Sequence, residues 1–303
     1  MIPYPKINPI IFSVGPIHVR WYGVMYVLGF IASYFLIQKQ ERSKQVGLVG
    51  ATAQDLVFYL AIGVIAGGRL GYILFYQYLN FGYYFHHPLQ IIATWNGGMS
   101  FHGGLIGCTI AALLFSRRKK IPLAVLADSA IVTAPIGLGL GRIGNFINGE
   151  LLGLPSHVPW AMVFPNAPAW AGGAVPRHPS QLYEALGEGL LLFIILWQLR
   201  KRHFKDGMMV AFFLLFYAVI RFIIEFFKEP DPPPLGYVYH FLTMGQVLCI
   251  AMVPPAIALM IYLNLKKTGQ ADTAKEAAAA GSVKEARAAK RIKQAGATNR
   301  ARQ

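Results

Sequence analysis

The sequence predicts an all-α integral membrane protein with seven transmembrane helices. Its 303 residues have a mean hydropathy of +0.45 and only 14% charged side chains, which is too apolar for an ordinary soluble domain of this length. The apolar residues also gather into segments close to the roughly 20 residues that a helix needs to cross a bilayer. Composition and segmentation together indicate a packed multi-pass bundle.

Seven apolar segments are candidate spans. They lie near residues 21–38, 55–77, 99–116, 121–141, 182–199, 208–228 and 242–264. Several are rich in glycine and alanine, as in AIGVIAGGRLG and APIGLGLG, and in lipid this composition favours close helix contact. The opening residues lack the basic start and small-residue cleavage site of a signal peptide. We therefore expect the first span itself to target the chain to the membrane.

The distribution of basic residues predicts the orientation. Of the 28 Lys and Arg residues, 21 fall in the first, third and fifth connections or in the tail, and the positive-inside rule places these parts in the cytoplasm. We expect a periplasmic N-terminal segment at 1–20, a seven-helix membrane domain at 21–265 and a basic, Ala-rich cytoplasmic tail at 266–303. The tail is either disordered or a surface helix on anionic lipid. The net charge of +15 is thus largely a topology signal, and we expect no nucleic-acid partner.

Two other kinds of site are disfavoured. Gly139, Gly141 and Gly144 match the G-x-G-x-x-G dinucleotide pattern formally, but a segment of helix-span length precedes them where that fold requires a strand. The histidines do not pair at metal-ligand spacing, so we expect no metal and no cofactor. The cysteines, Cys108 and Cys249, lie in apolar segments and are expected to be buried as small hydrophobes.

Four polar clusters remain at or near membrane depth, where ionisable groups are costly and usually face a cavity, a partner or a pathway. The first is His102 in MSFHGGLIG, for which a neutral histidine bonded to a helix-end carbonyl is the structural alternative. The second is GRIGNFINGE, with Arg142, Asn145, Asn148 and Glu150 after the predicted end of the fourth span. An interfacial loop with ordinary hydrogen bonds would also explain these residues.

The third cluster is Tyr217, Arg221 and Glu225, whose spacing of four places them on one helical stripe. A purely structural ion pair between the last two is the alternative. The fourth cluster is RHPSQLYE at 177–184, where Pro179 and Ser180 equally suit a helix start. All four clusters fall in the predicted outer half of the bundle, so we expect one polar cavity that opens outward.

Two arginines facing one chamber suggest a phosphate ligand, because a guanidinium binds phosphate oxygens bidentately and stays charged when partly buried. In a membrane the phosphate-bearing molecule at hand is a phospholipid. A nearby histidine is suited to proton transfer near neutral pH. The sequence has no G-x-S-x-G elbow and no cysteine in reach of the cavity, so we expect the nucleophile to come from a second substrate.

Five motifs carry a resemblance to a known family. FSVGPIHVRWYGVMY, NGGMSFHGGLIG, GLGLGRIGNFINGE, RHPSQLYEA and RFIIEFF, in this order, resemble bacterial prolipoprotein diacylglyceryl transferases over about residues 10 to 265. The resemblance implies a seven-helix enzyme of the bacterial inner membrane. It implies transfer of the sn-1,2-diacylglyceryl group of phosphatidylglycerol to the lipobox cysteine of a preprolipoprotein signal peptide, with glycerol phosphate released.

The resemblance also implies roles for individual residues. The family's essential histidine falls on His102, and its two arginines fall on Arg142 and Arg221. Its remaining functional positions fall on Asn145, Glu150, Tyr22 and Tyr217. We add Asn148 and Glu225 as substrate-site neighbours, and we expect Glu150 and Glu225 to orient arginines.

Two further expectations stay open. Asp128, in the middle of the fourth predicted span, either pairs with Arg69 or stabilises packing. The alternative function is a transporter or flippase for an anionic lipid or solute, since such proteins also place polar clusters in apolar bundles. The sequence shows no internal repeat of the kind that many transporters have.

Overall fold

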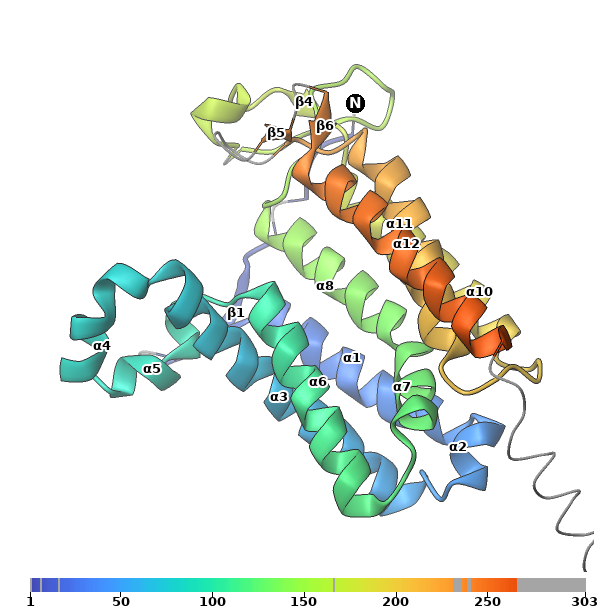
Figure 1. Ribbon diagram of the computed structural model, residues 1–303. Helices are drawn as coiled ribbons and strands as arrows, with labels where there is room; N and C mark the ends of the chain where they lie inside the picture. The colour runs from blue at the N-terminus through green and yellow to red at the C-terminus, as the bar shows by residue number, and fades with distance from the viewer. Residues whose placement is uncertain are drawn as a thin grey trace, which may run out of the picture. The chain divides into compact units, whose positions relative to one another are not determined.

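The computed structural model describes residues 2–5, 7–15, 17–165, 167–230, 236–238 and 241–265. The basic tail at 266–303 lies outside them, so its predicted disorder or helix is not addressed. By its internal contacts the chain divides into residues 1–260 and 261–303. The helical bundle described below belongs to the first unit, and only the last turn of its final helix extends past residue 260 (Figure 1).

Helices account for most of the described chain. In chain order they are α1 (Trp21–Gln38), α2 (Glu41–Gln45), α3 (Gly50–Tyr76), η1 (Tyr78–Asn80), α4 (Phe81–His86), α5 (Leu89–Ile92), η2 (Thr94–Asn96), α6 (Phe101–Lys119), α7 (Leu123–Ile131), α8 (Ala134–Asn148), η3 (Ala169–Ala171), α9 (Ser180–Glu184), η4 (Ala185–Leu191), α10 (Leu192–Leu199), α11 (Met208–Glu225) and α12 (Met244–Leu265). Segments α9, η4 and α10 form one continuous helix in which η4 is π-helical.

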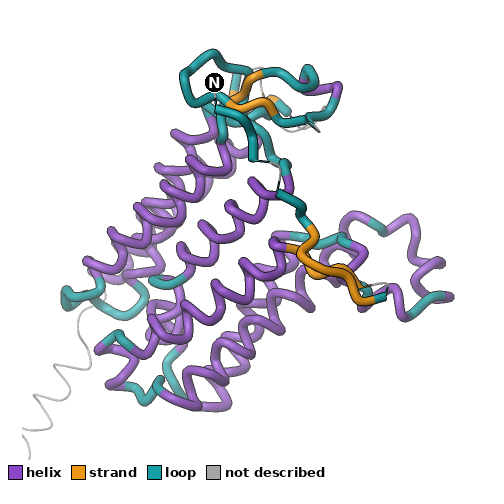
Figure 2. Tube along the Cα trace, turned by 180° about the vertical axis from the view of Figure 1, so that it is seen from behind, coloured by secondary structure: helices purple, strands orange, loops and turns teal. Residues whose placement is uncertain are grey.

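The strands form small antiparallel hairpins, one before the first helix and two in the connections. They are β1 (Ile10–Val14) with β2 (Ile17–Arg20), β3 (Met162–Val163) with β4 (Pro176–Arg177), and β5 (Tyr237–Val238) with β6 (Leu242–Thr243). Figure 2 shows them as short orange segments outside the helical bundle. The all-α class therefore holds for the membrane part, and the hairpins lie in the N-terminal segment and the connections.

Within the described residues, five helices are long and apolar enough to span a bilayer, and a bent helix pair makes a sixth. The five are α1, α3, Ser180–Leu199, α11 and α12, and the bent pair is α7 with α8. The third predicted span, 99–116, forms helix α6, but His102 and the basic residues of its last turn lower its mean hydropathy. Exposed apolar side chains such as Phe58, Ile62 and Leu74 cover the outward faces. The chain is thus an all-α, multi-pass membrane protein.

The fourth predicted span is broken and runs further than predicted. Helix α7 ends at Ile131, α8 begins at Ala134, and their axes differ by 42°. Pro135 stands in the first turn of α8, where its missing N–H needs no partner. Gly149 ends α8 in the left-handed conformation, with φ of 69°. The polar residues up to Asn148 therefore lie within a helix, whereas the sequence placed them after one.

Glycines bring the helices into direct backbone contact. A Cβ atom on Gly67 of α3 would lie 2.8 Å from the Cα of Gly107 in α6, and one on Gly71 would lie 2.6 Å from the Cα of Gly103. Their spacing of four residues aligns them along one face of each helix. The predicted close helix contact at AIGVIAGGRLG is confirmed.

The connections rich in basic residues meet at one end of the bundle. Arg42 of α2 forms a 2.7 Å ion pair with Asp206, which precedes α11. Lys119, at the end of α6, forms a 2.8 Å pair with Asp55 at the start of α3. Beneath them lies an apolar core centred on Phe115 and Leu126, both fully buried. This end carries the structural packing, and the buried charges lie elsewhere.

The second glycine contact positions α8 against η4. A Cβ on Gly139 would lie 2.9 Å from the Cα of Gly189. We predict that Gly139→Ala destabilises the protein by about 1–3 kcal/mol, because the backbones would have to separate. Unfolding curves in detergent micelles would measure the loss. Gly137→Ala is the matched control on the same helix, since nothing lies within 4 Å of its Cβ position. Equal losses in both variants would contradict the claim.

Candidate functional site

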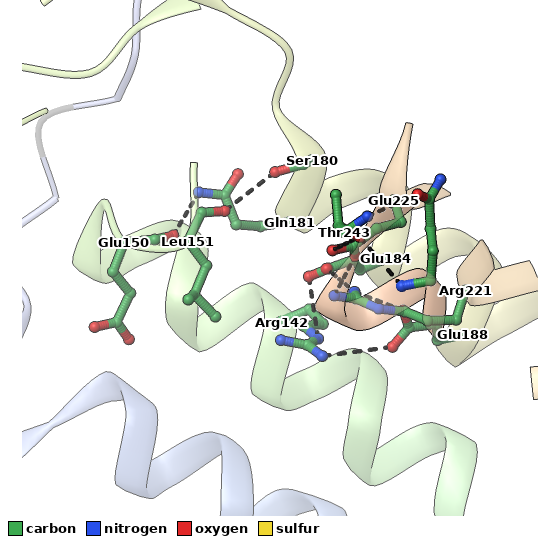
Figure 3. A network of polar contacts seen from close by, with 11 residues as sticks. Arg142, Glu150, Leu151, Ser180, Gln181, Glu184, Glu188, Arg221, Glu225 and Thr243 are labelled. Carbon is green, nitrogen blue, oxygen red and sulfur yellow. Dashed lines mark hydrogen bonds and ion pairs between the residues drawn. The ribbon is translucent and has the colours of Figure 1, made fainter. Parts of the chain in front are cut away.

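Two buried glutamates form the centre of the polar site. Glu184 ends α9 and Glu188 lies in the π-helical segment η4, and both side chains are fully buried. One turn of helix separates them, so their carboxylates point to the same side (Figure 3). Insertions of π-helix occur frequently at functional sites. Two carboxylates buried side by side require cations, and two arginines supply them.

Arg142 of α8 and Arg221 of α11 approach this carboxylate pair from different helices (Figure 3). Arg142 lies 3.1 Å from Glu184 through Nε and 3.6 Å from Glu188 through Nη2. Arg221 Nη1 donates to Glu184 and, at 3.0 Å, to Glu188. The prediction that both arginines face one site is therefore confirmed. The Arg142 side chain is 21% exposed and that of Arg221 is 10% exposed, so Arg142 is the more accessible of the two.

A third carboxylate extends the network toward α12. Arg221 Nη2 lies 2.7 Å from Glu225 Oε2, which confirms the pairing predicted from their spacing. The Thr243 hydroxyl donates to Glu225 Oε1 at 3.0 Å, and Thr243 also exchanges hydrogen bonds with Gln246. Tyr217 lies on the same stripe of α11, within the electrostatic field of Glu188 and both arginines. Four helical segments thus contribute to one buried network.

The other polar residues of GRIGNFINGE form a separate group. Glu150 Oε1 accepts hydrogen bonds from the amides of Asn145 at 2.7 Å and Asn148 at 3.2 Å, and its backbone oxygen accepts one from Gln181 at 2.6 Å. The expectation that Glu150 orients an arginine is wrong, because side-chain amides surround its carboxylate. The group anchors the C-terminal end of α8 to the start of α9.

Tyr22 packs across α8 on its other side. Its ring would lie 2.8 Å from a Cβ on Gly144, and its hydroxyl is 3.2 Å from that of Tyr26. The charges of Glu150 and Arg142 also act on the Tyr22 hydroxyl. Tyr22 therefore borders the α8 face that carries the predicted signature.

Arg177 has a structural position. It is fully buried, donates to the backbone oxygens of Gly153 and Ala171, and pairs with Glu229 at 2.7 Å. Its neighbour His178 packs on Tyr183, and burial lowers the pKa of this imidazole below its usual value. Pro179 and Ser180 begin α9, which confirms the helix-start interpretation of this motif.

His102 lies apart from the arginines. It is exposed in the first turn of α6 and lines a small hollow with Phe75, Tyr76 and Ser100. In the part of the chain that the structure describes, no hydrogen bond or ion pair joins it to the network. The single polar cavity predicted from all four clusters therefore stays a prediction. Helix α6 packs on α3, whereas α8 packs on α1 and η4, so His102 and Arg142 lie on helices with different packing partners.

The Asp128–Arg69 pairing is also wrong, and the packing alternative holds. The Asp128 carboxylate accepts the backbone N–H groups of Gly207 at 2.7 Å and Val210 at 3.1 Å, and so caps the start of α11. Arg69 donates to backbone carbonyls, including that of Gly97 at 2.6 Å. Both residues satisfy free backbone groups, which the spacing of charged residues in the sequence does not reveal.

Sequence reasoning missed Glu188 and named Glu184 only as part of a helix entry. A usable signal was present, because two acids at a spacing of four in an apolar span are costly unless cations face them. No group of three His, Cys, Asp or Glu residues in the described ranges is placed to hold a metal ion. The G-x-G-x-x-G match lies inside α8 and follows helix α7, so it lacks the strand that a dinucleotide fold uses.

Fold and site together define a multi-pass membrane protein with a buried arginine–glutamate network inside its bundle. A family model described as prolipoprotein diacylglyceryl transferase matches residues 9–262. The chain belongs to the prolipoprotein diacylglyceryl transferase family.

The sequence of this chain matches those of curated relatives along nearly their whole length. A phosphatidylglycerol–prolipoprotein diacylglyceryl transferase of Geobacter sulfurreducens is 48% identical over 88% of this chain and 99% of its own. Proteins of the same name from Desulfotalea psychrophila and Methylococcus capsulatus are 48% and 49% identical, over 88% and 86% of this chain and 97% of each relative. The resemblance stated from the five motifs is confirmed.

The buried network predicts an unequal cost for removing arginines. Arg221→Met would leave buried carboxylates without a cation and is expected to destabilise the protein by about 3–5 kcal/mol. Arg42→Met is the control, because its ion pair with Asp206 is half exposed and such pairs contribute about 0–1 kcal/mol. Denaturant unfolding in micelles would compare them, and similar losses would show that the network is not a buried ion-pair system.

Proposed function

We propose that this chain transfers the diacylglyceryl group of phosphatidylglycerol to the lipobox cysteine thiol in the signal peptide of preprolipoproteins. The products are a thioether-linked lipid on the protein and free glycerol phosphate. The observation that carries the proposal is the convergence of Arg142 and Arg221 on one buried point from separate helices. Family membership and the names of the relatives support the same reaction.

The geometry suits a phosphodiester. Phosphate and carboxylate offer the same fork of acceptor oxygens to a guanidinium, so the lipid phosphate can take over contacts now made by Glu184 and Glu188. Arg142 is the more exposed arginine and meets the head group first, and Arg221 then closes on it. Asn145, Asn148, Glu150 and Tyr22 shape the α8 side of the site, and Tyr217 and Glu225 shape the α11 side.

The reaction needs a thiolate and a stabilised leaving group. A free cysteine with a pKa of about 8.5 is only about 3% ionised at pH 7. The field of the arginines, or His102 as a base acting from α6, raises that fraction. The sulfur then attacks the glycerol carbon, the C–O bond breaks, and the arginines stabilise charge on the departing phosphate, an effect worth several kcal/mol in a preorganised site.

We also infer seven spans, with α6 as the span between α3 and the bent pair α7–α8. The N-terminus then faces the periplasm and the C-terminus the cytoplasm of the bacterial inner membrane. Support comes from the meeting of the basic connections at one end of the bundle, through the Arg42–Asp206 and Lys119–Asp55 pairs. Residues 21–265 form the catalytic membrane domain.

Replacing Arg142 by Lys tests the phosphate role. Lys keeps the charge but loses the fork, so we expect transferase activity to fall about 100-fold or more while the protein stays folded. Purified protein in liposomes with phosphatidylglycerol and a lipobox peptide would be assayed by the mass of the diacylglyceryl adduct. Full activity in Arg142→Lys would refute bidentate binding. His102→Ala, tested in parallel, is expected to lose activity without losing yield.

Cysteine accessibility tests the topology. In a background with Cys108 and Cys249 replaced by Ala, we expect His157→Cys to react with a membrane-impermeant maleimide in intact cells. Lys44→Cys should react only after the inner membrane is permeabilised. The reverse pattern would invert the proposed orientation, and labelling of both in intact cells would argue against a membrane between them.

A further inference from the structure

The buried network contains more negative than positive groups. Two guanidiniums, of Arg142 and Arg221, face three carboxylates. The carboxylates are 0% exposed for Glu184 and Glu188 and 4% for Glu225. With every group ionised, the network would hold one uncompensated negative charge out of reach of water. Such a charge is costly in a low-dielectric interior.

The surroundings offer no further cation among the described residues. The titratable and charged groups that face the carboxylate pair lie on the elements around it. They are Arg142 of α8, Tyr217, Arg221 and Glu225 of α11, and Cys249 of α12. The remaining polar neighbours, Thr243 and Gln246, are neutral. The missing positive charge is therefore not supplied by any side chain that the structure describes.

Two of the carboxylates are placed to share a proton. Glu184 and Glu188 are one helical turn apart, and both accept from the same nitrogen, Arg221 Nη1. Their second oxygens, the two Oε2 atoms, face Arg142, at 3.1 Å from its Nε for Glu184 and 3.6 Å from its Nη2 for Glu188, but they are buried and accept no aligned hydrogen bond in the described chain. Two acids held this close ionise as a coupled pair, and a single proton between them removes the like-charge repulsion.

We infer that Glu184 and Glu188 share one proton in the resting protein, and that this proton passes to the departing phosphate. The shared proton is inferred from the network alone, whereas its transfer to the phosphate rests on the proposed function. As the C–S bond forms, both electrons of the breaking C–O bond go to a phosphate oxygen. That oxygen takes the proton from the glutamate pair. The proton lost by the thiol returns to the pair, so the cycle balances without a further reactant.

This role adds to that of the arginines. They neutralise the phosphate during binding, whereas the pair prevents the leaving group from acquiring a second charge inside the bundle. Glycerol phosphate then leaves as a monoanion, which the arginines release more easily than a dianion. Glu188 and Glu184 are thereby proton-holding residues of the reaction and also partners of the arginines.

Infrared spectroscopy of the ligand-free protein tests the first half. We expect a carbonyl band of a protonated carboxyl group that shifts on labelling with ¹³C-glutamate. Glu184→Gln and Glu188→Gln should each abolish the glutamate band, because each leaves two carboxylates facing two arginines. Glu229→Gln, which alters the separate pair with Arg177, is the matched control and should keep it. A glutamate band that is absent from the parent protein, or that survives both substitutions, overturns the inference.

Kinetics test the second half. Glu188→Gln should lower kcat for adduct formation about 100-fold or more and leave KM for phosphatidylglycerol nearly unchanged, since the arginines remain. A fall confined to KM, or an unchanged kcat, would exclude proton transfer from the pair. If the parent protein shows the band but forms no adduct, the shared proton stands and the proposed function fails. If the parent protein forms the adduct but shows no glutamate band, the proposed function stands and the shared proton is excluded.

Discussion

The burial of Glu184 and Glu188 inside an apolar bundle is the constraint on which the rest of the site depends. An ionised carboxylate at this depth has no water to solvate it, so its charge must be met by protein groups. Arg142 and Arg221 meet it from two other helices. Each arginine is in turn costly to bury alone, so the charged groups hold one another in place.

The network can form only because the backbones approach closely. Arginine and glutamate side chains from neighbouring helices reach one another where α8 touches η4, and that contact is made by Gly139 and Gly189. A larger side chain at either position would separate the helices and lengthen the Arg142 contacts. The π-helical turn has a related effect, because the extra residue it inserts shifts the register after Glu184. Small residues and an irregular helix thus place the charges.

The sequence was sufficient for the helices and for interactions within one helix. Apolar segments of span length gave all seven helical segments, and spacing of four gave the Arg221–Glu225 pair. It was insufficient where partners come from distant helices. No sequence pattern around Glu188 indicates that Arg142 is its partner. Asp128 caps α11 by accepting backbone N–H groups, and almost any residue carries such a group, so the sequence does not identify the partner. Predicted depth also does not identify contacts: His102 of α6 and Arg142 of α8 both fall in the predicted outer half of the bundle, but α6 packs on α3, whereas α8 packs on α1 and η4.

A site whose arginines already have carboxylate partners is a selective one. A neutral or cationic head group offers the guanidiniums nothing in exchange for Glu184 and Glu188, so it cannot displace them without leaving buried charges unpaired. A phosphate with no balancing cation offers the same oxygen fork and charge as the carboxylate that it replaces. The displaced carboxylate then needs a proton or a new donor, which links binding to the protonation of the glutamate pair. Anion exchange and proton movement are therefore two parts of one electrostatic balance, set by the excess of acids over arginines.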